Sequence, residues 1–246
     1  MTSAWAPSGL VVVTDRRQAA RAGHELVDVV AAAVAAGART VLLREKDLPA
    51  TERRALARTV ADVAGASGAA LVVAGDCDLA GAVGAAAVHL ASTDPWPSPG
   101  EDRRALGRSC HSIDDLRDAR LHAATYATLS PVFATGSKPG YGPALGPEGI
   151  AAARSAVPGL RIVALGGVVP GAAGACLRSG ADAVAVMGAI MRAADPGAVT
   201  RELLAELGAA RVADVPAGPR PRRAPGPAAA DSHEPTVRLT AGGTDR

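Results

Sequence analysis

Short β-rich runs alternate with longer alanine-rich stretches along most of this chain, from Gly9 to Gly208. A run of four to six apolar or β-branched residues suits a buried strand, and the stretches between the runs have the composition of helices. Repeated strand–helix units predict a parallel sheet, because each helix returns the chain to the same end of the sheet. The predicted strands are 10–14, 40–44, 70–74, 86–90, 105–109, 125–130, 161–165 and 183–187.

Eight such units predict an α/β fold, a single (β/α)8 TIM barrel over residues 9–212. The chain has 246 residues, of which 48% are hydrophobic, so it can bury the core of such a barrel. Thr51 and Ser112 are expected to cap the helices that follow them. The predicted helices are 23–37, 51–66, 77–85, 112–123, 147–156, 170–180 and 196–208, with a further short helix near Glu101.

The two ends of the chain have a different composition from the barrel. Residues 1–8 are expected to be a flexible N-terminus. Residues 213–246 lose the apolar periodicity and fill with Pro, Gly, Ala and charge, which predicts a disordered Pro/Ala/Arg-rich tail. The "RPRR" run of this tail is either solvated or in contact with an acidic partner.

Composition argues against several classes of function. The net charge is +2, and two Trp, two Tyr and one Phe provide no stacking platform, so nucleic acid is not expected as a partner. Cys77, Cys110 and Cys176 lie too far apart for a CxxC pair and do not suggest a secreted disulfide scaffold. No apolar run reaches the roughly 18 residues of a membrane span. We therefore expect a cytoplasmic protein without a membrane partner.

Candidate functional residues follow the predicted strands, where TIM barrels carry their chemistry. The segment "SPVFATGSKPGYGPALG", residues 130–146, combines glycines with hydroxyls and one lysine, a composition suited to binding phosphate oxygens. Backbone amides of the last two strand–helix loops often bind phosphate in this fold. The sequence predicts two anion sites, formed by the cations Arg44, Lys46 and Lys138, the hydroxyls of Thr135 and Ser137, and the amides of Gly166, Gly167 and Gly188.

The joint pattern of motifs resembles one family. "TDR", "REK", "HL…D", "S.H", "SPVFATGSKPG", "LGGV" and "VMGAI" are similar in order and spacing to the thiamine phosphate synthase/TenI family, from about Val11 to Ile190. The resemblance implies a transferase of thiamine biosynthesis that couples hydroxymethylpyrimidine pyrophosphate to thiazole phosphate, through a carbocation-like transition state, and releases pyrophosphate. A sister group in the family isomerises a thiazole phosphate carboxylate.

The resemblance also implies roles for individual residues. Arg44, Lys46 and Lys138 would be catalytic and would bind the pyrophosphate. Magnesium (Mg²⁺) would be the cofactor, held by Asp94 and, if it replaces a missing neighbour, Asp76. Substrate-binding positions implied by the family are Ser109 for the pyrimidine, Thr135 and Ser137 for the thiazole, and Gly166, Gly167, Met187 and Gly188 for the thiazole phosphate.

The sequence departs from the synthase pattern at several positions. Leu42 replaces a glutamine that contacts the pyrimidine, and Ala74-Gly75 replace an Asn-Asp pair whose aspartate binds Mg²⁺. Asp76, one place further on, either substitutes for that aspartate or caps a helix. Pro131 stands where the tautomerases have a histidine, as it does in synthases.

Two alternatives to the synthase stay open. The first is a tautomerase-like paralogue that binds thiazole phosphate without coupling it, and the second is a non-catalytic phosphate-ligand sensor. His89 and His111 follow predicted strands and are either structural or acid–base groups. The sequence predicts small-molecule substrates but leaves the oligomeric state open.

Overall fold

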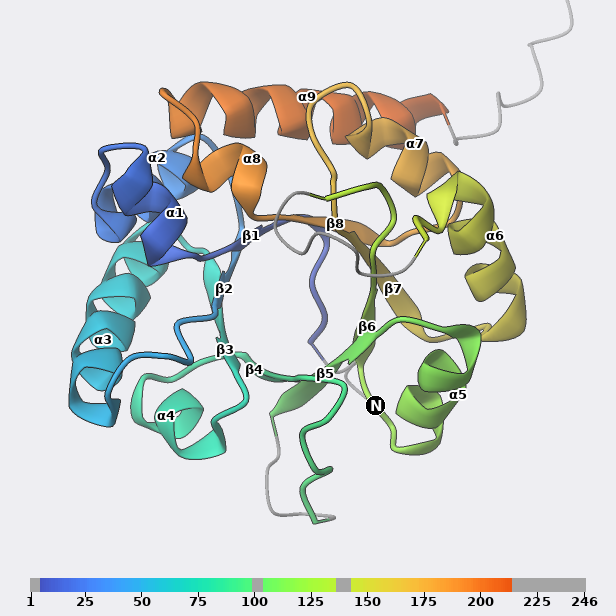
Figure 1. The fold of residues 1–246 in the computed structure, drawn as a ribbon, viewed down its shortest axis with the longest axis horizontal. Coiled ribbons are helices and arrows are strands. Elements are labelled where there is room, and N and C mark those ends of the chain that lie inside the picture. The colour runs from blue at the N-terminus through green and yellow to red at the C-terminus, as the bar shows by residue number, and fades with distance from the viewer. Residues whose placement is uncertain (1–4, 99–103, 136–142, 214–246) are drawn as a thin grey trace, which may run out of the picture. The chain divides into compact units, whose positions relative to one another are not determined.

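The protein is described here by a computed structural model that covers residues 5–98, 104–135 and 143–213, all within the unit Met1–Val215. Eight parallel strands close into a barrel in chain order, and the last strand pairs with the first (Figure 1). The predicted barrel is therefore confirmed, with each strand within one or two residues of its expected bounds. The strands are β1 (Gly9–Val13), β2 (Thr40–Leu43), β3 (Ala70–Ala74), β4 (Ala87–Leu90), β5 (Ala105–Cys110), β6 (Tyr126–Leu129), β7 (Arg161–Leu165) and β8 (Ala183–Val186).

Helices surround this ring of strands, as Figure 1 shows. Two of them were not expected from the sequence, α1 after β1 and the four-residue α8 after β8. None of the helices in the described ranges is long and apolar enough to cross a membrane. The helices are α1 (Arg16–Arg21), α2 (Leu26–Ala35), α3 (Ala50–Ala66), α4 (Cys77–Ala82), α5 (Ile113–Leu121), α6 (Gly146–Ala156), α7 (Ala173–Arg178), α8 (Gly188–Met191) and α9 (Pro196–Ala213).

The two expected helix caps have different outcomes. Ser112 caps α5: its side chain accepts a hydrogen bond from the Asp115 amide, and Asp115 accepts one in return from the Ser112 amide. This reciprocal capping box confirms the prediction for Ser112. The prediction for Thr51 was wrong, because α3 begins at Ala50 with Pro49 as its cap residue.

Alanine, valine and leucine side chains fill much of the barrel interior, together with the rings of Tyr126 and His89. The Tyr126 ring projects inward from β6 and occupies the place that a side chain at Gly107 on the neighbouring strand β5 would fill. The Trp5 ring packs edge-on against Tyr126 at a centroid distance of 6.4 Å. Trp5 lies in the segment expected to be a flexible N-terminus, whose residues 1–4 are outside the described residues.

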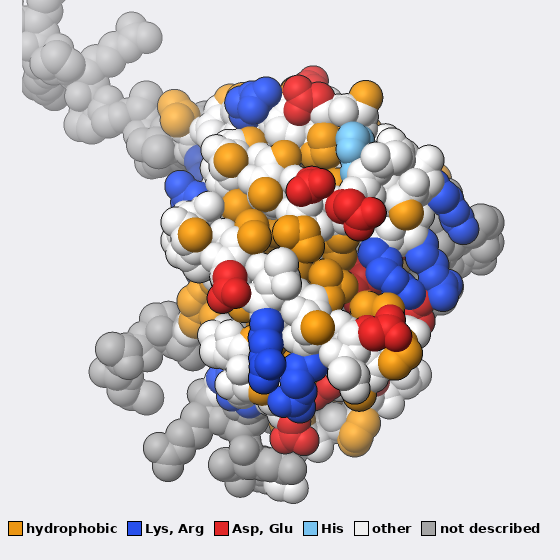
Figure 2. Space-filling model, turned by 90° about the vertical axis from the view of Figure 1, so that its left-hand side faces the viewer, with side chains coloured by type: hydrophobic (Ala, Val, Ile, Leu, Met, Phe, Trp, Pro, Cys, Tyr) orange, Lys and Arg blue, Asp and Glu red, His pale blue; other side chains and the backbone are white. Residues whose placement is uncertain are grey.

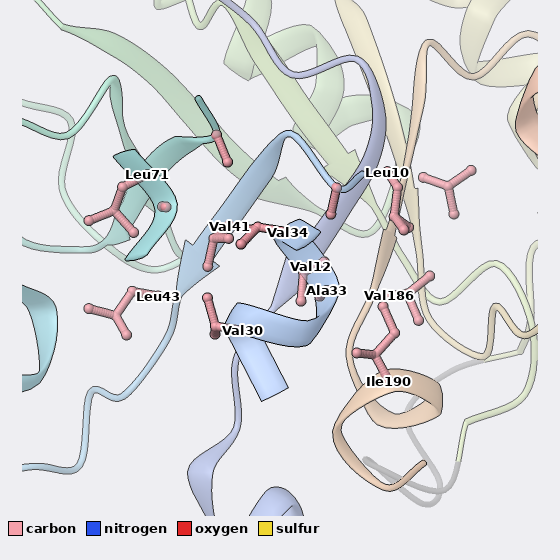
Figure 3. Close-up of a cluster of buried hydrophobic side chains, with 14 of the residues drawn as sticks. Leu10, Val12, Val30, Ala33, Val34, Val41, Leu43, Leu71, Val186 and Ile190 are labelled. Atoms are coloured by element: carbon pink, nitrogen blue, oxygen red, sulfur yellow. The ribbon is translucent and has the colours of Figure 1, made fainter. Parts of the chain in front are cut away.

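A larger apolar core lies between the strands and the helices. Figure 3 shows its part around β1, β2 and β8, where Val30 and Val34 of α2 face Val12 and Val41. This packing holds α2 against the barrel.

The outer surface carries both charged and apolar side chains. On the face shown in Figure 2, basic and acidic side chains lie among small hydrophobic ones. Helix α9 extends to Ala213, where the predicted tail begins. The rest of that tail and the helix expected near Glu101 lie outside the described residues.

Candidate active site

A cavity of about 520 Å³ opens at the carboxyl ends of the strands. This is the end of a TIM barrel at which catalytic residues gather. Lys138 and Ser137 lie outside the described residues, and Asp76 and Asp94 are not among the residues that line the cavity. The cavity brings together eight residues expected at the site: Arg44, Lys46, Ser109, Thr135, Gly166, Gly167, Met187 and Gly188.

The loops after β1 and β2 hold the two cations of the "REK" motif. The Arg44 amide donates to the hydroxyl of buried Thr14, at 2.9 Å. Between the cations, Glu45 is buried and accepts from the backbone amide of Arg16 at 3.1 Å and from its guanidinium at 3.0 Å. The acidic residue of the motif therefore has a structural role, while Arg44 and Lys46 reach the cavity.

Lys46 forms an ion pair with Asp94. Its ammonium nitrogen lies 3.0 Å from Asp94 Oδ2, which also accepts from the Ala91 amide at 2.8 Å. Burial raises the pKa of Asp94, but the Ala91 amide and the Lys46 ammonium outweigh this and hold the pKa below its usual value. Asp94 is therefore ionised at neutral pH.

Arg108 fixes the loop that carries Asp94. Its guanidinium donates to the carbonyl oxygens of Asp94 at 2.6 Å and Ser92 at 2.9 Å. The same guanidinium lies 4.4 Å from the centroid of the Trp96 ring, a cation–π contact. Arg108 projects from β5 on the side opposite to Ser109, so it supports the site from outside the barrel.

The Lys46–Asp94 pair packs against Gly75. A Cβ atom at this position would lie 2.6 Å from the Lys46 nitrogen and 2.9 Å from Asp94 Oδ2. Gly75 also has a φ of +64°, in the left-handed region that favours glycine. A side chain at position 75 would therefore have to displace the lysine.

Asp76 is engaged in other contacts. One carboxylate oxygen accepts from the Leu79 amide at 2.8 Å and caps α4, and the other pairs with Arg53 at 3.1 Å. Reaching a metal ion would break both contacts. Across the described ranges, no three His, Cys, Asp or Glu side chains gather closely enough to form a metal site. Of the two expected metal ligands, Asp94 is the one that could contribute a carboxylate to Mg²⁺, which often keeps several waters and takes few protein ligands.

His89 lies in the barrel interior with both ring nitrogens engaged. One lies 3.2 Å from the Tyr126 hydroxyl and the other 3.0 Å from the Ser109 hydroxyl. Burial first, and then the Lys46 charge, lower its pKa to about 4. His89 is therefore neutral near pH 7 and orients Ser109 toward the cavity. His111 also borders the cavity, and its Nδ1 lies 2.9 Å from the Ser130 carbonyl oxygen.

The loop after β7 needs its two glycines. Gly166 and Gly167 have φ values of +98° and +67°. A Cβ on Gly166 would lie 2.9 Å from Pro131 Cα, and one on Gly167 would lie 2.7 Å from the Phe133 carbonyl oxygen. These glycines let the loop after β6 approach β7, and that approach shapes one wall of the cavity.

Two further residues at the cavity were not expected from the sequence. Arg192 donates from Nη1 to the side-chain oxygen of Gln18, and Gln18 Nε2 donates to Asp15 at 2.7 Å. All three residues line the cavity. Arg192 lies four residues after Gly188, a spacing that puts two residues on the same face of a helix. The sequence indicates this proximity only if α8 is recognised as a helix.

Comparison with known proteins identifies the family of this chain. A family model described as thiamine monophosphate synthase matches residues 10–190. The chain belongs to this family. Thiamine monophosphate synthase relatives include the thiamine-phosphate synthase of Moorella thermoacetica, 37% identical over 186 residues, which are 74% of this chain and 88% of the relative. The thiamine-phosphate synthase of Roseiflexus castenholzii is 36% identical over 205 residues, 80% of this chain and 88% of the relative.

Solved structures extend the comparison. The thiamine phosphate pyrophosphorylase from Pyrococcus furiosus matches with a TM-score of 0.72 and 28% identity, covering 82% of this chain and 96% of that one. Orotidine 5'-phosphate decarboxylase from Pyrococcus horikoshii shares the fold alone, with a TM-score of 0.60 and 14% identity over 81% of this chain and 99% of that one. In this chain one wall of the cavity is apolar, where Leu42 and Ala74 are buried.

Proposed function

We propose that this protein is a thiamine phosphate synthase, a transferase that joins hydroxymethylpyrimidine pyrophosphate to thiazole phosphate and releases pyrophosphate. One observation carries the proposal: Arg44 and Lys46 lie on the same cavity as the glycine-rich ends of β7 and β8. A cavity with cations on one side and glycine backbone on another suits two phosphorylated substrates.

The proposed reaction breaks the bond between the pyrimidine methylene carbon and the pyrophosphate oxygen. The electron pair of that bond leaves with pyrophosphate, and the thiazole nitrogen supplies the pair for the new carbon–nitrogen bond. Negative charge grows on the leaving oxygen in the transition state. Arg44 and Lys46 stabilise that charge; the Thr14 hydroxyl fixes the backbone at Arg44, and Asp94 holds the Lys46 ammonium in place.

Recognition of the pyrimidine rests on fewer polar groups than the family pattern implies. We propose that the Ser109 hydroxyl, oriented by His89, contacts the ring. Leu42 and Ala74 offer apolar contact in place of the glutamine and asparagine of the family pattern. The expected consequence is weak discrimination among substituted pyrimidines, since apolar walls select poorly against added polar groups.

We propose Mg²⁺ as the divalent ion, with Asp94 as its protein carboxylate and pyrophosphate oxygens completing its shell. When bound, the ion would neutralise part of the charge on the leaving group. Gly75 contributes no ligand, so the protein's own share of the binding is small. The ion is then expected to bind mainly as a complex with pyrophosphate.

Predictions from the sequence complete the proposed site. Lys138 would add a third cation on the pyrophosphate, and Thr135 and Ser137 would hold the thiazole. Thr135 lines the cavity, which supports its role. We also propose that residues 9–212 form the functional domain and that the protein works in the cytoplasm as an enzyme on small molecules, without nucleic acid or membrane.

The tautomerase-like alternative is less well supported. Pro131, which lines the cavity, occupies the position of the tautomerase histidine. A pKa of about 4 and two engaged nitrogens make His89 a poor proton shuttle. His111 is then the histidine on which this alternative depends.

The decisive experiment supplies both phosphorylated substrates with Mg²⁺ and measures thiamine phosphate and pyrophosphate. We expect stoichiometric formation of both products. Arg44→Ala should lower kcat as well as substrate affinity, because its charge acts in the transition state. Arg120→Ala, an exposed arginine late in α5, is the control and should have wild-type kinetics.

Other outcomes distinguish the alternatives. Isomerisation of a thiazole phosphate carboxylate without coupling would favour the tautomerase. Binding of thiazole phosphate with neither reaction would favour the sensor. Unchanged coupling in Lys138→Ala would remove that residue from the proposed clamp.

A further inference from the structure

Arg192 lines the cavity, and the reaction proposed above assigns it no role. The residue follows α8, and its side chain folds back toward the start of that helix. Its guanidinium carbon lies 2.8 Å from the place where a Cβ on Gly188 would be. The absence of a side chain at Gly188 thus lets the guanidinium lie against the backbone that borders the cavity.

The position of Arg192 is fixed from two sides. In α8, Ile190 and Met191 are fully buried, and Figure 3 shows Ile190 beside Val186 at the end of β8. At the other end of the side chain, Nη1 donates to Gln18. Gln18 is in turn held by Asp15, the cap residue of α1. Such support lowers the entropy cost of binding a ligand with this long side chain.

The charge of Arg192 is not neutralised by its partner. Gln18 is neutral and occupies one of the five guanidinium donors. In the part of the chain that the structure describes, Arg192 forms no ion pair, whereas Lys46 is paired with Asp94 and Arg53 with Asp76. An arginine with free donors on a cavity wall suits an anion with several oxygens, such as phosphate.

We propose that Arg192, positioned by Gln18, binds the phosphate of thiazole phosphate and makes the enzyme select the phosphorylated thiazole over the thiazole alcohol. This inference rests on the proposed function. It adds a side-chain cation to a subsite for which the sequence predicted backbone amides alone. Arg192 is thus a specificity residue contributed by α8.

Calorimetric titration of the full chain with thiazole phosphate and with the thiazole alcohol tests this inference. In Arg192→Ala, we expect Kd for thiazole phosphate to rise by about tenfold to hundredfold, the range for losing hydrogen bonds to a charged group. Kd for the alcohol should not change. In Arg192→Lys, Kd for thiazole phosphate should lie between the values for the wild type and Arg192→Ala, because lysine keeps the charge but not the paired guanidinium donors.

Kinetics provide the second readout. In Arg192→Ala, KM for thiazole phosphate should rise while KM for the pyrimidine pyrophosphate stays the same. Gln18→Ala should show the same pattern with a smaller change. Arg120→Ala serves as the matched arginine control, and thermal unfolding of each variant checks that the fold is intact.

Several outcomes would overturn the inference. These are wild-type affinity for thiazole phosphate in Arg192→Ala, an equal loss of affinity for the alcohol, a selective loss for the pyrimidine pyrophosphate, or no binding of thiazole phosphate by the wild-type chain. If thiazole phosphate binds through Arg192 but no coupling occurs, the proposed function fails and the inference stands. If coupling is intact in Arg192→Ala with unchanged KM values, the inference fails and the proposed function stands.

Discussion

At the scale of single residues, Gly75 is the position where the sequence departs from the family pattern and where the Lys46–Asp94 ion pair packs. The family pattern has an aspartate there, and in this chain the Lys46–Asp94 pair lies over the bare backbone. Gly75→Asp should add a second carboxylate beside Asp94 and lower the Mg²⁺ concentration for half-maximal coupling by roughly tenfold, while its Cβ displaces the Lys46 ammonium and lowers kcat. Aspartate tolerates a positive φ better than most residues, but the displaced Lys46–Asp94 pair adds to the backbone strain, so the stability cost should exceed about 1 kcal/mol.

Two measurements check this expectation. Mg²⁺ activation curves give the dependence of coupling, and paramagnetic resonance of Mn²⁺ with pyrophosphate gives metal binding without turnover. Gly75→Asn is the control, since it has the same size and φ requirement but no charge. Equal metal binding in both variants would show that a carboxylate at position 75 does not reach the ion.

His89 predicts how stability depends on pH. In the folded protein its pKa is about 4, against 6.5 for an ordinary histidine. Between these values the unfolded chain binds a proton that the folded chain does not, so the free energy of unfolding falls as pH decreases. The contribution is fully present above pH 6.5, and about 3 kcal/mol is lost by pH 4.

Urea unfolding of the wild type and His89→Gln over this pH range measures the effect. The variant should lack this part of the slope, because glutamine does not titrate. Parallel slopes in the two proteins would assign the pH dependence to other groups.

Gly107 explains how a tyrosine fits inside the barrel. A Cβ at this position would overlap the Tyr126 ring, so Gly107→Ala should destabilise the protein by about 1–3 kcal/mol through overpacking. Gly208→Ala in α9 is the control, because nothing lies within 4 Å of its added Cβ. Thermal unfolding should separate the two, and equal melting temperatures would contradict this packing.

At the scale of helices and strands, the caps offer a matched test. Ser112→Ala removes the side-chain acceptor of the Asp115 amide but keeps the bond from the backbone amide of residue 112 to Asp115, and should cost about 1 kcal/mol. Thr51→Ala should cost little, because α3 has no side-chain cap bond. Chemical denaturation compares them, and a larger loss for Thr51→Ala would contradict the observed caps.

The same scale shows what the sequence could predict. The strands were predictable because the buried strands of a parallel sheet are short, apolar and regularly spaced, as "ALVVA" and "RIVAL" are. Helix α8 was not, since four residues give no helical periodicity. With α8 missed, Arg192 could not be placed over Gly188.

The residues of the candidate site were predictable where their position depends on a strand and not where it depends on a loop. Arg44, Lys46 and Ser109 were found because they directly follow or end a strand, where the barrel fixes their location. The engagement of Asp76 with Leu79 and Arg53 could not be predicted, because it depends on the path of a loop. The sequence left its metal and capping roles equally open.

At the scale of the whole molecule, the proposed domain boundary is testable. A chain ending at residue 215 should have the melting temperature and coupling kinetics of the full chain, because Ala210 is the last core residue among those that the structure describes. Differential scanning calorimetry and the coupling assay measure both. Loss of coupling in a stable truncated chain would give the tail a role in function and revive the partner hypothesis.

Strands β1 and β8 are hydrogen-bonded neighbours through Gly9 to Val12 and Ala183 to Val186. Every strand of the barrel therefore has two hydrogen-bonded neighbours, and the barrel does not require the chain to begin and end between β8 and β1. A circularly permuted gene that begins ahead of β2, with a linker joining the old ends, would encode the same neighbour for every strand. The barrel would keep the same order of strands even though the strand that comes first in the sequence had changed.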